Sequence, residues 1–408
     1  MQVAAFTNHR RPPTLGLGPK CSFETMNKPI PIVFVITNLD CGGAEVMLLR
    51  LLSCLDRGKF TAQVISLIET GPLGRKIEAL GVPVRALGMR RGRPSLNALI
   101  RLVLWLRQDR PHLVQTWMYH ADLLGGLAAW IAGGIPVAWG IHQSDLSWAG
   151  NRFLTLLTVK VCAWLSRWVP KHIICCSEAS RQAHQAAGYV AEKLVSIPNG
   201  YDVDAFKPDA VSRILIRAEL DVRDDMMVIG MVARAHPQKD YPNLLRAARV
   251  ILRERCDVCF VLCGQDVTWE NEELTALIDP ADRAQFRLLG QREDIPRVMA
   301  AFDVATLSSF GEAFPNVISE AMSCGVPCVV TDVGDAALIV GETGIVVPNR
   351  DSVRLAEGWS RMLDLGREDR IRLGLAARER IKDLYNVSKF VGRYEALYEM
   401  TSRKLTPV

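Results

Sequence analysis

Two cations in the second half of the chain have the type and spacing needed to bind a diphosphate. Arg234 follows the apolar run 227–232, and Lys239 comes five residues later, just before a helix expected to begin near residue 240. Cations at the end of a strand, beside a helix N-terminus, suit a diphosphate that gains charge as it departs as a leaving group. Because exposed loop cations are common, the pair defines a site only together with other residues.

Two carboxylates lie in the segment 308–322, with seven residues between them. Glu312 is expected in a turn, and Glu320 in the helix that follows. Glu312 would face a cleft from its loop, whereas Glu320 would accept hydrogen bonds from ligand hydroxyls. Glu320 has apolar neighbours, and a partly buried carboxylate needs a partner. The residues expected to place backbone groups of the helix start toward a ligand are Phe314, Pro315, Asn316 and Val317.

A glycine pair precedes the first expected helix of the chain. Gly42 and Gly43 follow the apolar run 32–37, and such a turn lets backbone N–H groups approach a phosphate or a sugar. Many turns between a strand and a helix need glycine, so the signal is weak alone. The chain has neither a G-x-G-x-x-G nor a Walker pattern at this place, which argues against a dinucleotide or NTPase site there.

Two histidines and one asparagine are further candidates for contact with a sugar or an acceptor. His120 and His142 each follow an expected strand of the first half, and Asn199 lies in a Pro-Asn-Gly turn. Imidazole at a cleft edge can hydrogen-bond a sugar hydroxyl, although a lone histidine beside a strand is more often structural.

Metal binding is not expected. Asp202 and Asp204 form a D-x-D pattern, but they follow a turn and precede an expected helix, which favours turn and capping roles. A cysteine cluster contains C-x-x-C but lacks a second ligand pair at matching spacing, and its sequence is typical of a buried strand. We therefore expect no metal and no cofactor. The cysteines of this cluster are Cys256, Cys259 and Cys263.

Two successive blocks of alternating strands and helices would position these residues. The fold class is therefore α/β, with two Rossmann-like, doubly wound parallel sheets whose ligand crevices face each other across a cleft. The expected domains are a disordered tail at 1–27, an N-terminal Rossmann-like domain at 28–203, a C-terminal Rossmann-like domain at 204–385 and a final helix at 386–408 that crosses back to the first domain. The expected strands are 32–37, 63–68, 82–87, 113–117, 136–141 and 172–176 in the first block, and 227–232, 258–263, 286–289, 304–307, 327–330 and 345–347 in the second.

Composition excludes several classes of protein. The 408 residues are 49% hydrophobic and 23% charged, which fits a globular protein rather than a disordered one. A formal net charge of +5, dispersed along the chain, does not indicate a nucleic-acid partner. The uncharged stretch 123–141 is long enough to span a bilayer, but Gly133, Gly134 and Pro136 divide it into a helix and a strand.

A basic, aromatic surface is one of two interpretations of the segments 90–93 and 153–168. Arg90, Arg91 and Arg93 in the first segment, with Arg152 and Lys160 near the second, would attract anionic lipid. The other interpretation is an amphipathic helix packed on the sheet, beside a solvated basic loop.

Taken together, these motifs resemble glycosyltransferase family 4, whose members have the GT-B fold. The resemblance covers nearly the whole chain after Met26, and the ordered set is specific although no single motif is. The motifs are Gly42-Gly43-Ala44-Glu45, Ile197 to Asp202, Arg234 with Lys239, Gly264, Leu289-Gly290, Glu312 to Glu320, and Thr343-Gly344.

The resemblance implies a retaining, metal-independent transferase that uses a UDP- or GDP-linked sugar, with UDP favoured. The domain at 28–203 would bind the acceptor, and the domain at 204–385 would bind the nucleotide sugar. Arg234 and Lys239 would hold the diphosphate, Glu312 would orient the donor sugar, and Glu320 would bind the ribose. The acceptor would attack on the face from which the leaving group departs, and a donor phosphate would take its proton.

Further roles and two departures also follow from the resemblance. The Gly42-Gly43 loop would close over donor and acceptor, and His142 matches the cleft histidine of the family. The nucleobase would be read by backbone groups near Gly264. Ala313 replaces a usual glycine and Tyr201 a usual valine or isoleucine, and neither change removes a charged role.

The expected function is transfer of a hexosyl or N-acetylhexosaminyl group to a glycan or polyprenyl-diphosphate-linked saccharide, in the biosynthesis of a cell-surface polysaccharide such as lipopolysaccharide or exopolysaccharide. The expected location is the cytoplasm or the inner face of the cytoplasmic membrane, in peripheral contact with anionic lipid. A sugar-nucleotide epimerase of GT-B fold and a catalytically silent sugar-nucleotide-binding subunit remain alternatives.

Overall fold

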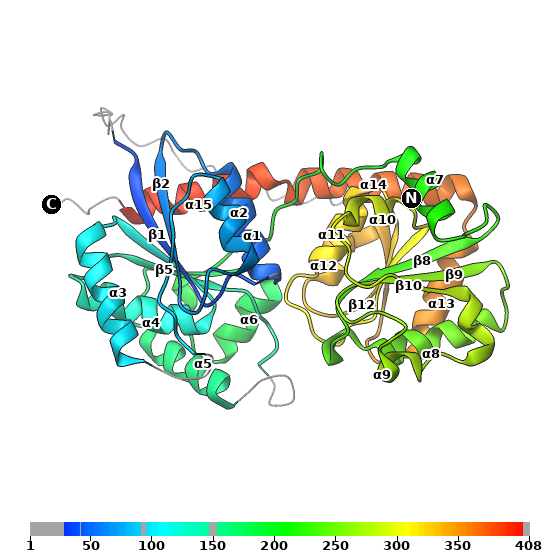
Figure 1. The fold of residues 1–408 in the computed structure, drawn as a ribbon, viewed down its shortest axis with the longest axis horizontal. Helices are drawn as coiled ribbons and strands as arrows, with labels where there is room; N and C mark the ends of the chain where they lie inside the picture. The colour runs from blue at the N-terminus through cyan, green and yellow to red at the C-terminus, as the bar shows by residue number, and fades with distance from the viewer. Residues whose placement is uncertain (1–27, 41, 91–94, 147–152, 403–408) are drawn as a thin grey trace, which may run out of the picture.

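Two α/β domains lie side by side in the computed structural model, which describes residues 28–40, 42–90, 95–146 and 153–402 (Figure 1). The first domain has a seven-stranded sheet in the order β3-β2-β1-β4-β5-β6-β7, and the second a six-stranded sheet in the order β10-β9-β8-β11-β12-β13. Neighbouring strands are parallel throughout. The expected fold of two doubly wound sheets is confirmed.

The first domain alternates strands and helices from residue 30 onward. Its strands are β1 (Ile30–Ile36), β2 (Phe60–Ser66), β3 (Val84–Ala86), β4 (Leu113–Trp117), β5 (Val137–Ile141), β6 (His172–Cys175) and β7 (Leu194–Ser196). Its helices are α1 (Gly43–Cys54), α2 (Gly71–Ala79), α3 (Leu96–Asp109), α4 (Tyr119–Ile131), α5 (Phe153–Leu165) and α6 (Glu178–Ala186), with the short 3-10 helix η1 (Ala191–Lys193).

The second domain repeats the pattern and ends in three helices. Its strands are β8 (Met227–Val232), β9 (Val258–Cys263), β10 (Phe286–Leu288), β11 (Val304–Leu307), β12 (Cys328–Thr331) and β13 (Gly344–Val347). Its helices are α7 (Ala210–Glu219), α8 (Tyr241–Leu252), α9 (Glu272–Thr275), α10 (Ile295–Ala300), α11 (Asn316–Ser323), α12 (Ala336–Val340), α13 (Ser352–Leu363) and α14 (Arg367–Tyr385), followed by α15 (Val387–Ser402), with 3-10 helices η2 (Pro237–Lys239), η3 (Pro280–Gln285) and η4 (Gly341–Thr343).

Both faces of the first sheet are buried, as parallel strands flanked by helices require. Phe34 of β1 lies in the core beneath α1, α2 and α15, whereas its neighbours Val33 and Val35 lie in the core beneath α3, α4 and α5. Alternate residues of one strand therefore serve two separate cores. Both cores hold the strands rigidly, and the loops at the strand ends carry the site.

The final helix α15 belongs spatially to the first domain. It contacts α1 and β4, and its Phe390, Tyr394 and Tyr398 are buried in the same core as Phe34. In Figure 1 the red helix runs back across the top of the first domain after the orange α14. An isolated bridge between Tyr201 and Asn386 marks the place where the two connecting segments meet.

The apolar stretch 123–141 and two cysteines of the cluster belong to ordinary helices and strands. The stretch 123–141 forms part of α4 and then β5, and among the described helices none is long and apolar enough to cross a membrane. Cys259 and Cys263 are buried in β9. The tail 1–27 lies outside the described residues. Arg91, Arg93 and Arg152, which belong to other segments, also lie outside them.

Candidate active site between the two domains

A cleft of about 740 Å³ separates the two domains. It lies at the carboxyl ends of the strands, where β1 neighbours β4 and β8 neighbours β11, which is the place where doubly wound sheets bind ligands. Every site residue proposed from the sequence lines this cleft: Gly42, Gly43, His120, His142, Asn199, Arg234, Lys239, Gly264, Glu312, Phe314, Pro315, Asn316, Val317 and Glu320.

Lys239 and Glu312 form an ion pair on the second-domain side of the cleft. The Lys239 Nζ atom lies 2.5 Å from Glu312 Oε1, and their side chains are only 20% and 12% exposed. The Ser309 hydroxyl donates to the same oxygen at 2.7 Å. The two residues assigned to the diphosphate and to the donor sugar are therefore adjacent, with opposite charges balanced.

Glu320 is paired with a cation from the other domain. The Arg50 Nη2 atom of α1 lies 2.6 Å from Glu320 Oε1, and the two side chains are 16% and 13% exposed. Burial raises the pKa of Glu320, while the Arg50 guanidinium opposes that rise. Arg50 also lies over the Tyr201 ring, 5.1 Å from its centroid, so the pair is held in a mostly apolar setting.

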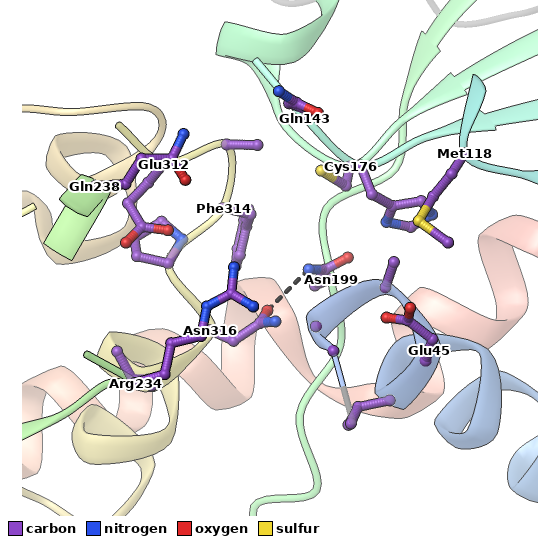
Figure 2. A pocket seen from close by; sticks show the side chains of 18 of the residues that line it. Glu45, Met118, Gln143, Cys176, Asn199, Arg234, Gln238, Glu312, Phe314 and Asn316 are labelled. Carbon is purple, nitrogen blue, oxygen red and sulfur yellow. Dashed lines mark hydrogen bonds between the residues drawn. The ribbon is translucent and has the colours of Figure 1, made fainter. Parts of the chain in front are cut away.

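Asn316 joins the two sides of the cleft at the start of α11. The Asn199 Nδ2 group donates to Asn316 Oδ1 at 2.8 Å, and the Tyr201 hydroxyl donates to the same oxygen at 2.5 Å. Figure 2 shows the first of these bonds, with Arg234 pointing toward Asn316 inside the pocket. The other amide oxygen, that of Asn199, is buried without a protein partner, so it can accept from a ligand.

Glycines allow the backbone to come close at two places in the site. A Cβ atom on Gly43 would lie 3.0 Å from Asn316 Nδ2, across the cleft. A Cβ atom on Gly264 would lie 2.1 Å from the Ala233 carbonyl oxygen, directly before Arg234. Any larger residue at 264 would therefore displace the loop that carries the Arg234 guanidinium.

His142 is a half-buried imidazole that lines the cleft. Its ring stacks on Trp117 with centroids 4.3 Å apart, and Trp117 stacks in turn on Tyr394 of α15. Burial lowers the pKa of His142 to about 3, so the ring is uncharged at neutral pH. Its Nε2 atom has no protein partner, which fits a hydrogen bond to a ligand hydroxyl. His120 also lines the cleft and is exposed.

The structure adds residues that sequence reasoning did not place in the site. Arg50 stands in the apolar run of α1, where a charge calls for a partner, and this was the available signal. Tyr201 was noted only as a departure from the family pattern. Met118 lines the cleft with φ +72°, a strained backbone that no sequence pattern announces. Glu45 and Gln238 are among the other lining residues that were not proposed.

Asp202 has a local role. Its Oδ1 atom accepts from the backbone N–H groups of Asp204 and Ala205, at 2.9 and 3.0 Å, so it caps the turn after the hinge. Neither Asp202 nor Asp204 lines the cleft. The described part of the chain holds no group of three or more His, Cys, Asp or Glu residues arranged to bind a metal ion.

Two family models match the chain, one for each domain. Residues 41–205 match the model "Glycosyltransferase Family 4", and residues 227–364 match "Glycosyl transferases group 1". The matched segments contain all fourteen cleft residues that were proposed from the sequence.

Curated relatives and solved structures agree with these models. The chain is 27% identical over 346 residues to the Escherichia coli UDP-Gal:alpha-D-GlcNAc-diphosphoundecaprenol alpha-1,3-galactosyltransferase. This alignment covers 81% of this chain and 87% of that protein. It is 26% identical to the putative glycosyltransferase EpsF of Bacillus subtilis, over 74% of this chain and 79% of that one. The crystal structure of Anabaena HepE in complex with UDP and glucose has the same fold, with a TM-score of 0.78 at 24% identity over 91% of this chain and all of that one. Fold, cleft and relatives agree that the chain is a GT-B glycosyltransferase and belongs to glycosyltransferase family 4.

Proposed function

We propose that the chain transfers a hexosyl or N-acetylhexosaminyl group from a UDP-sugar to a polyprenyl-diphosphate-linked saccharide, with retention of configuration and without a metal ion. The observation that carries the proposal is the convergence of Arg234, Lys239, Glu312 and Glu320 on one cleft wall, opposite His142. The similarity to a transferase that uses UDP-Gal and a diphosphoundecaprenol-linked acceptor supports both substrate classes.

The second domain supplies the charge that the leaving group needs. Arg234 and Lys239 would bind the donor diphosphate, and the N-terminus of α11 would add backbone N–H groups at Asn316 and Val317. Since Glu312 already balances Lys239, the arriving diphosphate takes over a cation that is oriented before binding. Preorganised positive charge stabilises the growing negative charge on the diphosphate.

The reaction needs no protein nucleophile in this proposal. The acceptor hydroxyl oxygen bonds to the anomeric carbon on the face from which the diphosphate departs. The bond from that carbon to the diphosphate oxygen breaks with its electron pair on the diphosphate, and the hydroxyl proton passes to a donor phosphate oxygen. Neutral His142 would donate to or accept from a sugar hydroxyl and so hold the ring during transfer.

The test is a transfer assay with Lys239→Ala. With a panel of UDP- and GDP-sugars and a polyprenyl-diphosphate-linked N-acetylhexosamine, we expect Lys239→Ala to lower kcat/KM at least about 100-fold. The matched control is Lys382→Ala, which removes a lysine from a surface pair on α14. Unchanged turnover by Lys239→Ala would refute the assigned role of this lysine.

Two further measurements separate the proposal from its alternatives. Activity should persist in excess EDTA, and NMR of the product should show the same anomeric configuration as the donor. An epimerised sugar nucleotide formed without acceptor would indicate the epimerase, whereas UDP binding without turnover on any acceptor would indicate a silent binding subunit. Peripheral action at the inner face of the cytoplasmic membrane would follow from a polyprenyl-linked acceptor.

A further inference from the structure

One outer face of the first domain is strongly apolar. We name it the α3–α5 face and define it by exposed side chains of α3, α4, α5 and the turn that follows. Each side chain is between 43% and 71% exposed. These residues are Leu96, Ile100, Leu104, Trp130, Ile131, Leu154, Leu157, Trp164 and Trp168.

The face is continuous because its three helices lie side by side on the same side of the sheet. Helix α4 contacts both α3 and α5, and all three helices cover the core that contains Val33 and Val35 (Figure 1). At one end the Arg107 guanidinium donates to the Ile131 carbonyl, joining α3 to α4. At another, the Trp164 and Trp168 rings meet edge to face at 5.0 Å.

Helix α5 is apolar on both sides, which core packing alone does not require. Val159 and Cys162 bury one side against the sheet, yet Leu154, Leu157 and Trp164 project from the other side. Its single charged residue is Lys160. A helix that covers one face of a soluble domain normally presents polar residues to water, and a large exposed apolar patch indicates an interaction surface.

The charges around the face have one sign. In the segments 95–112, 119–136 and 153–171, the two acidic residues are Asp109, paired with Arg85, and Asp122, which is 1% exposed. A surface of exposed tryptophan and leucine, on segments whose exposed charged residues are cations, is complementary to an anionic bilayer. The exposed cations are Arg101, Arg107, Arg110, Lys160, Arg167 and Lys171.

The face reaches the mouth of the cleft. Thr155, in the first turn of α5, lines the cleft, while its neighbours Leu154 and Leu157 are exposed on the α3–α5 face. A saccharide whose polyprenyl chain stays in the bilayer would have a short path from the membrane to His142.

We propose that the α3–α5 face docks on the headgroup and upper acyl region of an anionic bilayer. The apolar side chains would enter the interface and the cations would contact lipid phosphates, with the cleft mouth turned toward the membrane. This proposal rests on the proposed function, which requires a lipid-linked acceptor, and it names the surface that meets the lipid.

Vesicle flotation tests the surface without using transfer activity. The full chain should float with phosphatidylglycerol vesicles and at least tenfold less with phosphatidylcholine vesicles or in high salt. Leu157→Ser with Trp164→Ser should lower flotation at least tenfold, and Lys160→Gln with Arg167→Gln severalfold. The matched control is Ile214→Ser with Leu215→Ser, because these α7 residues are 69% and 53% exposed on the second domain.

Soluble-substrate activity separates this proposal from the proposed function. The α3–α5 variants should hydrolyse UDP-sugar and glycosylate a water-soluble acceptor analogue at the wild-type rate, which also shows that they fold. Wild-type chain that transfers sugar in detergent but floats with no vesicle would overturn the docking surface and leave the function intact. If the wild-type protein floats with vesicles but transfers sugar from no UDP-sugar, the proposed function is overturned instead.

Self-association is the competing outcome. If a second copy covered the α3–α5 face, sedimentation equilibrium would give a dimer, and Leu157→Ser with Trp164→Ser would convert it to a monomer. A dimer that dissociates in this variant, together with no flotation of the wild-type chain, would overturn the proposal.

Discussion

The two glutamates assigned to the donor each hold a cation in the structure. Glu312 pairs with Lys239 from the same domain, whereas Glu320 pairs with Arg50 from the other domain. Removing one member of such a pair leaves a poorly solvated charge, which costs more than the pair itself contributes. Each of these two carboxylates is thus balanced by a cation before any donor arrives.

The Arg50 pair therefore predicts a clear effect on stability. We expect Arg50→Met to lower the free energy of unfolding by about 3 kcal/mol, because Glu320 is left buried without its cation. Urea unfolding measures this value. Adding Glu320→Gln should restore part of the loss, while Lys382→Met, in an exposed pair, should cost less than about 1 kcal/mol. Equal losses in the single and double variants would contradict the pairing.

Two histidines, His142 and His184, contribute stability that is lost in mild acid. Burial lowers the pKa of His142 to about 3 and that of His184 to about 4, whereas the pKa of a solvent-exposed histidine is 6.5. Below pH 6.5 the unfolded chain binds more protons than the folded one, so stability is lost as pH falls from about 6.5 toward 4.

The loss should reach about 1.4 kcal/mol per histidine for each pH unit. Urea unfolding at pH 7 and pH 5 measures it, and His142→Gln should reduce the slope. His112→Gln, at an exposed position, is the control and should leave the slope as it is. A slope that His142→Gln leaves unchanged would contradict a lowered pKa of the folded His142 ring.

At the scale of elements, helix α15 supports the site from behind. Tyr394 stacks on Trp117, which stacks on His142, so three rings from α15, β4 and the loop after β5 form one column. Tyr394 is 1% exposed and Trp117 is fully buried. The rotamer of the cleft histidine therefore depends on a helix at the other end of the sequence.

Tyr394→Ala should lower both stability and activity. A cavity of that size in a core costs about 3 to 5 kcal/mol. At a temperature where the variant remains folded, kcat/KM should also fall, because Trp117 can tilt and His142 loses its position. Thermal unfolding and transfer assays measure the two effects. Met400→Ala on the same helix, 57% exposed, should change neither.

Most elements follow from the sequence, and the exceptions have physical reasons. Strand β7 (Leu194–Ser196) was not predicted, because three residues at a sheet edge are too few for a pattern. Strand β1 begins at Ile30 rather than at residue 32. It includes Pro31, which has no backbone N–H to donate to a neighbouring strand. At Pro31 the strand pairs only with β2, since pairing with β4 begins at Ile32, so the missing N–H is tolerated.

The site was predictable where a motif carries the chemistry and not where a partner comes from another domain. Arg234, Lys239 and Glu312 follow from residue type and spacing. The Arg50–Glu320 pair joins residues 270 positions apart, and no local pattern links them. The strained backbone of Met118 is likewise set by tertiary packing.

At the scale of the whole molecule, several contacts hold the two domains across the cleft. The Ser144 hydroxyl donates to the Glu312 carbonyl at 2.5 Å. The Asp335 carboxylate accepts from the backbone N–H groups of Glu178 and Ala179, both at 2.8 Å, at the N-terminus of α6. A carboxylate of one domain thus caps a helix of the other, where the helix dipole favours it.

Asp335→Ala should loosen the arrangement of the domains. Loss of a capping carboxylate costs about 1 kcal/mol, and this energy acts between the domains rather than within one. We expect small-angle X-ray scattering to show a larger radius of gyration for the free variant than for the wild type. Asp332→Ala, at an exposed position nearby, should scatter like the wild type.

The position of α15 in the first domain also has a consequence for biosynthesis. The ribosome makes β1 and α1 early and Phe390, Tyr394 and Tyr398 late, yet all pack in one core. Until α15 emerges, the apolar side chains beneath it stay uncovered, so the first domain made is completed last. A nascent chain stalled before Val387 would carry a folded second domain and an unfinished first one.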